Sequence, residues 1–516
     1  MDSGGTHHNR HAVGRRASAF WKAMLAEAIA RKIVPLSLVP DSLRESRLDL
    51  EPFPVLAQSG GQDGNAVPAE PPRCRIARTD SQSTQDTFWT VASAFANTDA
   101  ASTVDRTSWV SRESAVIFDD RWMLSHNKDF TKLLPPEILD KVFGYVPYKA
   151  LLQCQLVSRN WRDVTNSNTI WREKYAQEWG LSPTVTTLPS GKSRDWRRLY
   201  EVRTALDRNM LNSQYASYHL EGHKDGVYCA KFDNKEILTG SRDNTLKVWD
   251  FKTRKQLHSL DGYGGSVLCM AMDDKIVVSG SSDTRCLIYD RKTYRQIGKL
   301  EFHDAPVLDV ALTGSRIISA GKDGRIAVWR RRDMHMQYYL KAHRGPVNAV
   351  AVCGSTFLTA GADGLIKQWS TATGEHIQTL RGHTRGLACI DVSSCARYAV
   401  SGSNDRTLRI WNMETGESRC LEGHLDVVRS VCISGSRVIS GSRVISGSRV
   451  ISGSYDSMIK VWDLRSGKFL SEYRQPNGNS VFCVRANARY IVATSVGVHP
   501  TILDFGATLG ASAPNN

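Results

Sequence analysis

Hydrophobic and polar positions follow different patterns in successive parts of the chain. Residues 1 to about 125 show little periodicity. Segment 51–88 is rich in Pro, Gly, Gln, Ser and Asp, a composition typical of disordered chains. One amphipathic helix is predicted over 17–33, where apolar residues recur at helical spacing.

From residue 130 to 175, apolar residues recur every three or four positions in three runs. The first run, 134–143, begins around two prolines, which the first turn of a helix tolerates well. The second covers 151–161, and the third ends near residue 171. Three short helices cannot bury all of these side chains among themselves, so we expect part of this surface to contact another protein. A further helix is predicted over 196–213.

Beyond residue 215 the chain is built from a repeated unit that begins with Gly-His and ends with Trp-Asp. The spacing from the His-like to the Trp-like residue is 26 in the first four units, 28 in the fifth and 38 in the sixth. An Asp lies six residues before each Trp-like residue, and a Ser or Thr lies four residues before that Asp. Units of this length are typical of a β-propeller with four strands per blade.

The repeated polar residues can form a buried hydrogen-bond chain within each blade, which would be costly to leave half satisfied. We therefore interpret them as structural, because a catalytic Ser/His/Asp set would not be copied six times. Tyr263 and Tyr289 replace the His and the Trp of the second unit. The structural residues of the other units are His223, Asp243 and Trp249; His303, Asp323 and Trp329; His343, Asp363 and Trp369; His383, Asp405 and Trp411; and His424, Asp456 and Trp462.

A seventh, decayed unit covers about 477–505, with Asp504 where the Trp is expected. The strand-like segment 215–220 precedes the first unit and can supply its missing outer strand, which closes the ring and protects its edges. The predicted fold is a small all-α module followed by an all-β seven-bladed propeller. The predicted boundaries are a largely disordered 1–125, a helical module at 130–176, a helical linker at 177–214, the propeller at 215–507 and a tail at 508–516.

The long sixth spacing comes from the hexapeptide Gly-Ser-Arg-Val-Ile-Ser, which is written three times over 435–452. Removing two copies restores the spacing to 26. Twelve is an even number, so the alternation of side chains survives, but the pairing register becomes ambiguous by six residues. We expect the extra copies to extend or loop out the hairpin on the face opposite the Gly-His loops, and a copying error in the gene is the alternative.

Composition narrows the function classes only slightly. The net charge of +15 suits nucleic acid, a membrane surface or acidic peptides. No stretch approaches 18 apolar residues, and no signal-peptide core is present. The basic first 26 residues leave an organelle transit peptide as an alternative to a cytoplasmic or nuclear location. The eleven cysteines form no Cys-x-x-Cys pair, so neither a metal nor a cofactor is expected. Four of them occupy one repeat position and are expected to be small buried residues: Cys229, Cys269, Cys389 and Cys483.

Position in the repeat also predicts which residues line the face of the ring. The residue five after each His-like residue lies near the channel mouth, which selects Tyr228, Leu268, Leu308, Asn348, Ala388, Arg429 and Phe482. The residue before each Asp lies in a turn on the same face, which selects Arg242, Ser282, Lys322, Ala362, Asn404 and Tyr455. Arg242, Arg385 and Arg429 come from three blades and are expected to converge, a pattern that favours an anionic ligand such as a phosphate. The alternative is a solvated basic rim.

The helical segment resembles an F-box in three strings: Leu134-Pro-Pro-Glu-Ile-Leu, Leu151-Leu-Gln-Cys-Gln-Leu-Val-Ser-Arg-Asn-Trp161 and Ile170-Trp171-Arg. The resemblance implies docking on a Skp1-like adaptor, and through it on a cullin-RING ubiquitin ligase. The docking residues that it implies are Leu134, Pro135, Ile138, Leu139, Val142 and Phe143. A small helical cap without a docking role is the alternative.

The repeats resemble the WD40 family, and blade by blade they are most similar to the β-transducin repeat-containing group of F-box proteins. Examples are Ser241-Arg-Asp-Asn-Thr245, Gly265-Ser-Val-Leu-Cys269 and Arg385-Gly-Leu-Ala-Cys389. The resemblance implies binding of an Asp-Ser-Gly-x-x-Ser peptide phosphorylated on both serines. The implied contact residues are Tyr228, Arg242, Ser266, Ser282, Leu308, Asn348, Arg385, Gly386, Ala388, Arg429 and Tyr455. One departure is Val427, where the group has Leu.

The resulting hypothesis is a non-catalytic substrate-recognition subunit of an SCF-type (Skp1-cullin-F-box) ubiquitin ligase that captures phosphorylated proteins. One alternative is a Cdc4-like reader of phosphothreonine-proline, but Leu268, Leu308 and Ala388 stand where such readers place arginines. Another is a non-ligase scaffold that binds nucleic acid through its charge. The basic residues surround a small mouth rather than forming a stripe with stacking aromatics, so neither nucleic acid nor a membrane is expected as a partner.

Overall fold

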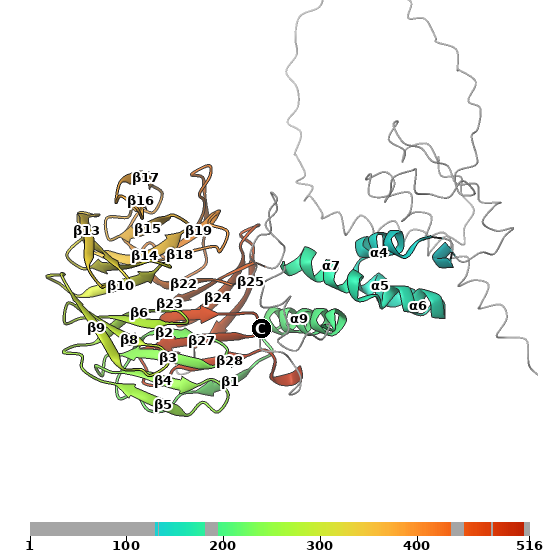
Figure 1. Ribbon diagram of the computed structural model, residues 1–516, viewed down its shortest axis with the longest axis horizontal. Coiled ribbons are helices and arrows are strands. Elements are labelled where there is room, and N and C mark those ends of the chain that lie inside the picture. The colour runs from blue at the N-terminus through green and yellow to red at the C-terminus, as the bar shows by residue number, and fades with distance from the viewer. Residues whose placement is uncertain (1–129, 133, 181–193, 435–447, 476–477, 510–516) are drawn as a thin grey trace, which may run out of the picture. The chain divides into compact units, whose positions relative to one another are not determined.

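The computed structural model describes residues 130–132, 134–180, 194–434, 448–475 and 478–509 (Figure 1). The described residues belong to two units, with the boundary between Glu173 and Lys174. The predictions for 1–125 and for most of the extra hexapeptide copies lie outside the described residues.

Short helices form the described part of the first unit. They are the 3-10 turn η3 (Phe130–Lys132), α4 (Pro136–Tyr145), α5 (Tyr148–Cys154), α6 (Arg159–Thr165) and the start of α7 (Asn168–Trp179), which continues past the unit boundary. The single helical run predicted over 151–161 is wrong, because the chain forms two helices there. Ser158 caps α6 by accepting a hydrogen bond from the Trp161 N–H at 3.2 Å. Leu156, in the break between α5 and α6, is 79% exposed.

Aromatic side chains hold these helices together. Phe143 of α4 meets Trp161 of α6 edge to face, with ring centroids 5.6 Å apart. The Trp171 indole N–H donates to the carbonyl oxygen of Thr165 at 2.9 Å, so its polar atom is satisfied although the side chain is fully buried. The module therefore has a core of its own around α4 and α6.

Seven four-stranded antiparallel sheets, each a blade of the ring, make up most of the second unit. Blade 1 consists of β2 (Val227–Phe232), β3 (Glu236–Ser241), β4 (Leu246–Asp250) and β5 (Gln256–Leu260). Blade 2 consists of β6 (Val267–Met272), β7 (Ile276–Ser281), β8 (Arg285–Asp290) and β9 (Gln296–Glu301). Blade 3 consists of β10 (Val307–Leu312), β11 (Arg316–Gly321), β12 (Arg325–Arg330) and β13 (Met336–Lys341). Blade 4 consists of β14 (Val347–Cys353), β15 (Thr356–Gly361), β16 (Ile366–Ser370) and β17 (His376–Leu380).

The remaining blades complete the ring. Blade 5 consists of β18 (Leu387–Val392), β19 (Tyr398–Ser403), β20 (Leu408–Asn412) and β21 (Ser418–Leu421). Blade 6 consists of β22 (Val428–Ser434), β23 (Arg449–Ser454), β24 (Met458–Asp463) and β25 (Phe469–Arg474). Blade 7 consists of β26 (Val481–Ala486), β27 (Tyr490–Ser495), β28 (Thr501–Asp504) and β1 (Ala216–His219), and a 3-10 turn η5 (Ala507–Leu509) follows it.

The ring closes by the predicted exchange of a strand. β1 pairs antiparallel with β28, so the first strand of the propeller becomes the outer strand of its last blade (Figure 1). Asp504, in the place of the repeated Trp, accepts two hydrogen bonds from the Arg489 guanidinium, at 2.8 and 3.0 Å. The predicted count of seven blades and the small helical module are confirmed.

The third copy of the hexapeptide supplies strand β23. Its residues pair with β22 in the register Val431↔Ser452 and Ser434↔Arg449. Only the third copy is followed by Gly453-Ser454-Tyr455-Asp456. Asp456 then bonds to His424 at 2.7 Å, so this copy alone completes the polar network of the blade.

Helix α9 (Trp196–Leu211) lies against blades 6 and 7 and ends two residues before the predicted boundary. Asp207 forms a buried ion pair with Arg449 of β23, with the two charged atoms 3.0 Å apart. The Tyr473 hydroxyl donates to the carbonyl oxygen of Met210 at 2.5 Å, and the Asn209 amide donates to the carbonyl oxygen of Phe505 at 2.8 Å. The helix is therefore a fixed part of the propeller unit.

Candidate binding site

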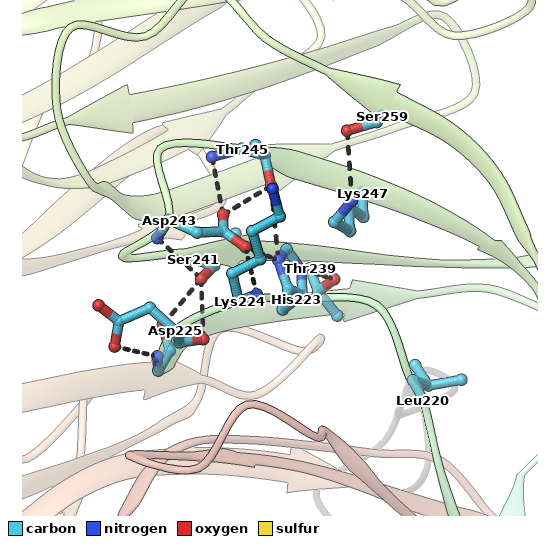
Figure 2. Close-up of polar contacts among 12 residues, drawn as sticks. Leu220, His223, Lys224, Asp225, Thr239, Ser241, Asp243, Thr245, Lys247 and Ser259 are labelled. Atoms are coloured by element: carbon cyan, nitrogen blue, oxygen red, sulfur yellow. Dashed lines mark hydrogen bonds and ion pairs between the residues drawn. The ribbon is translucent and has the colours of Figure 1, made fainter.

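Each blade except the second and the last contains the predicted chain of polar groups. In blade 1, His223 Nδ1 lies 2.7 Å from Asp243 Oδ2 and His223 Nε2 lies 2.7 Å from the Thr239 hydroxyl. Figure 2 shows these side chains. The Trp249 indole N–H donates to the same hydroxyl at 2.8 Å. The equivalent three contacts recur in blades 3, 4, 5 and 6.

One arrangement of protons satisfies all the hydrogen bonds of this polar network. The indole N–H donates to the hydroxyl oxygen, the hydroxyl donates to His Nε2, and His Nδ1–H donates to the carboxylate. It requires a neutral imidazole, and burial indeed lowers the pKa of His223, His343 and His383. Burial opposes ionisation of Asp243, but hydrogen bonds from Thr245, the Lys224 N–H and His223 outweigh it and lower the pKa of this carboxyl to about 2. The network holds the Gly-His loop against the turn that follows the second strand of the blade.

The inner strands of neighbouring blades are also linked by side chains at all seven junctions. Three buried cysteines donate to a carbonyl oxygen of the next blade, and Cys483 does so to blade 1, over 3.5–4.0 Å. Asp309 accepts a hydrogen bond from Val350 N–H at 2.8 Å, and the Ser430 hydroxyl accepts one from Val484 N–H at 3.0 Å. Asn348 donates to the carbonyl oxygen of Leu387 at 2.6 Å. These links fix the inner strands that line the channel.

Residues of the inner strands surround a narrow cavity of about 70 Å³ on the axis. All seven positions selected from the repeat line it, namely Tyr228, Leu268, Leu308, Asn348, Ala388, Arg429 and Phe482. A wider hollow of about 470 Å³ lies on the Gly-His face above blades 3 to 6. It is lined by Leu308, Asn348, Arg385, Ala388, Asn404, Val427, Arg429 and Tyr455.

Two arginines from neighbouring blades provide the charge of this hollow. Arg385 is exposed in the loop before β18, and Arg429 is half-buried on β22. Neither has a carboxylate within 4.0 Å among the described residues. Arg429 directs one N–H to the carbonyl oxygen of Ala388 at 3.4 Å, which leaves most of its five donors available. The hollow can therefore bind an anion with a planar set of acceptors or a phosphate.

Apolar surface lies beside these arginines. The rings of Tyr228 and Phe482 stack with centroids 5.2 Å apart, and Tyr455 meets Phe482 edge to face at 5.8 Å. Phe482 thus connects two residues that the sequence assigned to the site. Leu308 and Ala388 complete the apolar wall of the hollow.

Four predicted contact residues lie outside the lining of both cavities. Arg242 is exposed, and its Nε lies 3.7 Å from Asp225 Oδ2. Ser266 and Ser282 are neighbours, since the Ser282 N–H donates to the carbonyl oxygen of Ser266 at 2.9 Å. Position 386 has no room for a side chain, because a Cβ on Gly386 would lie 2.7 Å from the carbonyl oxygen of Ala362.

The structure adds two residues to the predicted contacts. Asn404 and Val427 line the hollow beside Arg385 and Arg429. The repeat offset had already identified Asn404 as a residue of this face, and Val427 as a departure from the β-transducin repeat-containing group. Nothing in the sequence alone indicated that the hollow lies over blades 3 to 6 rather than over the whole ring.

The predicted docking stripe of the helical module lies mostly in its core. Leu134, Ile138, Leu139, Val142 and Phe143 are buried, and only Pro135 of the six is exposed. The packing of α4 against α6 accounts for this, because the apolar face of α4 is used within the module. A surface stripe of all six residues is therefore absent from the described module. Its exposed large apolar side chains are Tyr145, Leu156 and Val157.

Neither a metal cluster nor a membrane span is found in the described part of the chain. Those residues contain no group of three His, Cys, Asp or Glu side chains that could hold a metal ion. Among the described helices, none has both the length and the apolar character needed to cross a membrane.

Known protein families match both halves of the described chain. A family described as F-box-like matches residues 131–177. The family described as WD domain, G-beta repeat matches six segments: 215–250, 254–290, 294–330, 335–370, 374–412 and 416–463. The chain combines an F-box-like region with WD repeats. The seventh blade lies beyond the matched WD segments, in agreement with its decayed repeat.

Curated relatives match part of the chain. The chain is 28% identical over 161 residues to a protein of Arthroderma otae named probable E3 ubiquitin ligase complex SCF subunit sconB, covering 25% of this chain and 24% of that protein. It is 24% identical over 152 residues to an F-box protein of Saccharomyces cerevisiae, with the same coverage. It is 31% identical over 143 residues to F-box/WD repeat-containing protein 7 of Drosophila melanogaster, covering 26% and 11%. The matched region thus spans about a quarter or less of these relatives.

Among solved structures, the WD40 β-propeller domain of Doa1 matches with a TM-score of 0.50 at 22% identity. The match covers 58% of this chain and 99% of that domain. At this identity the likeness supports the fold alone.

Proposed function

We propose that this chain is the substrate-recognition subunit of an SCF-type ubiquitin ligase. In this proposal the F-box-like region docks a Skp1-like adaptor, and the WD-repeat propeller binds a phosphorylated target protein. The proposal is supported by the names of the SCF subunit relatives and by the pairing of the two regions in one chain. The chain itself would perform no covalent chemistry and would act by raising the concentration of target lysines near the ligase.

The observation that carries the target assignment is the hollow of about 470 Å³ with two arginines and no acidic partner for either among the described residues. A phosphoserine brings a charge of about −1.5 to −2 at pH 7 and three acceptor oxygens, which the two guanidinium groups can bind. The apolar wall of Leu308, Ala388 and Tyr455 can hold the peptide beside the phosphate. We therefore propose a doubly phosphorylated Asp-Ser-Gly-x-x-Ser-like segment as the ligand, with Arg242, Ser266 and Ser282 on blades 1 and 2 as candidate contacts for the second phosphate.

A Cdc4-like ligand, phosphothreonine-proline, is the second candidate. It is disfavoured because Leu268, Leu308 and Ala388 occupy the channel positions at which arginines would be needed. Comparing the two phosphopeptide classes by fluorescence anisotropy on the full chain tests the choice. Tighter binding of a phosphothreonine-proline peptide would overturn the Asp-Ser-Gly-x-x-Ser assignment.

Docking of the adaptor is testable on the exposed apolar side chains of the F-box-like region. Leu156 and Val157 lie together in the break between α5 and α6, 79% and 36% exposed. Replacing both by Asp should abolish copurification with a Skp1-like adaptor without lowering the melting temperature. Exchanging the neighbouring exposed Gln153 for Asp is the matched control, because it adds charge without removing apolar surface. Full binding by the double variant would contradict this docking surface.

A further inference from the structure

Charge differs sharply between blades at one equivalent position of the repeat. The residue two before each His-like residue stands where the outer strand leads into the Gly-His loop. It is Glu221, Asp261, Glu301, Lys341, Arg381 and Glu422 at the six points where the chain leads into blades 1 to 6. Because the blades share one backbone geometry, these six side chains occupy the same place on their blades. Only Lys341 and Arg381, which lead into blades 4 and 5, carry a positive charge there.

Further exposed cations surround these two. We define the basic sector as Lys322, Lys341, Arg344, Arg381, Arg385 and Arg406. All six are exposed, and none forms an ion pair within the described residues. On this face of blades 3 to 5, Asp304 pairs with Arg325 at 2.8 Å. The other acids in these loops are Asp323, Asp363 and Asp405, each bound to its histidine. That Asp is present in every one of the first six blades, so it does not alter the contrast between blades.

Backbone contacts join the loops of the sector into one surface. The N–H groups of Ala342 and His343 donate to the carbonyl oxygen of Gly324, which joins the loops of blades 3 and 4. Arg385 belongs both to the sector and to the lining of the hollow. On the other side of the hollow, the loop of blade 6 carries the exposed acids Glu422 and Asp426. The charge around the hollow is therefore one-sided.

We propose that the basic sector binds an acidic segment of the target. This segment extends from the hollow across the loops that lead into blades 4 and 5. This deepens the proposed function and rests on it. Cations that make no folding contact and gather on one side of a site raise its potential for anions and hasten association. A segment that left over blade 6 would instead meet Glu422 and Asp426. Several Asp, Glu or phosphorylated residues on one flank of the degron-like core fit this surface.

The test uses the full chain and peptides with one doubly phosphorylated core. Three peptides carry this core with four glutamates on its N-terminal side, with four glutamates on its C-terminal side, or with Ser-Gly in their place. A fourth peptide carries the glutamates on an unphosphorylated core. The sector variant is Arg344→Glu/Arg381→Glu/Arg406→Glu, which spares every residue that lines the hollow. Its matched control is Lys252→Glu/Lys292→Glu/Lys468→Glu, an equal charge change in exposed turns on the opposite face.

One acidic flank is expected to tighten binding roughly tenfold at low salt, since exposed pairs contribute modestly and add together. The gain should vanish in the sector variant, persist in the control and shrink at about 0.5 M salt. If the core binds but neither flank changes the affinity, or if both triple variants lose the gain equally, the sector proposal is overturned and the proposed function stands.

The two proposals fail separately. If the phosphorylated core adds nothing but the acidic peptides bind and lose binding only in the sector variant, the sector stands and the degron assignment falls. If no peptide binds, both are overturned. A mixed-sequence oligonucleotide that binds more tightly than the acidic peptides, and is lost in the same variant, would overturn the choice of a polypeptide.

Discussion

Deleting two copies of the triplicated hexapeptide, residues 441–452, should leave a shorter and intact sixth blade. Because the copies are identical, the same polypeptide results from deleting 435–446. β22 and β23 then keep the pairing that ends at Ser434↔Arg449, and only Gly447 and Ser448 connect them. Blade 4 shows that this connection works, since Cys353 pairs with Thr356 across Gly354-Ser355.

The size of the effect follows from the length of the connection. It falls from the 14 residues of 435–448 to two, and loop-closure entropy scales with the logarithm of length, so folding should become more favourable by about 1–2 kcal/mol. For a domain of this size that corresponds to a rise in melting temperature of roughly 2–6 °C. Arg429 and Tyr455 flank the hairpin in the hollow, so peptide affinity should stay within about twofold of the parent chain.

Thermal denaturation and fluorescence anisotropy of the full chain and the deletion measure both effects. Removing one copy, 441–446, should give an intermediate melting temperature. Removing all three, 435–452, is the disruptive control, because it takes away Ser452, whose hydroxyl contacts both His424 and Trp462. A fall of many degrees or a large loss of affinity in the two-copy deletion would refute the assignment of β23 to the third copy.

Three other perturbations test the fold that supports the site. Arg449→Met removes the shorter of the two ion pairs of Asp207 and leaves the one to Arg203 at 3.7 Å, so it should cost about 1.5–3 kcal/mol of unfolding free energy, measured in urea. An unchanged midpoint would contradict the docking of α9. Thr359→Val removes the hydroxyl that contacts His343 and Trp369 and leaves two buried polar groups without a partner, so it should lower the free energy of unfolding by about 1–3 kcal/mol for each group. The matched control Thr373→Val, at an exposed position, should leave the free energy of unfolding almost unchanged. Burial lowers the folded-state pKa of three histidines, so the unfolded chain takes up protons first as the pH falls. Their contribution to stability should therefore be complete above about pH 6.5 and fall as the pH drops through that value, whereas Asp243, whose pKa is about 2, should contribute a separate loss only between about pH 4 and 2. A melting temperature that does not fall between pH 7 and 5 would contradict the neutral imidazoles.

The fold could be predicted from the sequence because each blade repeats one set of buried polar residues at fixed spacing. The same regularity located the channel-lining positions, since an offset from the His-like residue is also an offset along the inner strand. Even the strand exchange was predictable, because the last unit lacked an outer strand and 215–220 stood unused before the first.

The rest depends on tertiary contacts that no repeat encodes. The burial of Phe143 follows from its contact with Trp161, which joins two helices that the periodicity alone could not place against each other. The break before α6 rests on one capping hydroxyl, that of Ser158. The position of the hollow depends on which side chains the loops at Arg385 and Val427 bring beside the channel mouth.

The most direct test of the account is the binding of a doubly phosphorylated Asp-Ser-Gly-x-x-Ser peptide to the full chain, measured by fluorescence anisotropy beside its unphosphorylated twin. Charged hydrogen bonds contribute about 1.5–3 kcal/mol, so Arg429→Ala should weaken binding roughly 10- to 150-fold with an unchanged melting temperature. Exchange of Arg419, an exposed arginine on β21 outside the hollow, for Ala is the matched control. Phosphate-dependent binding that Arg429→Ala weakens by this factor is the predicted result. Equal weak binding of both peptides by the folded chain would contradict the proposed capture of a phosphorylated target.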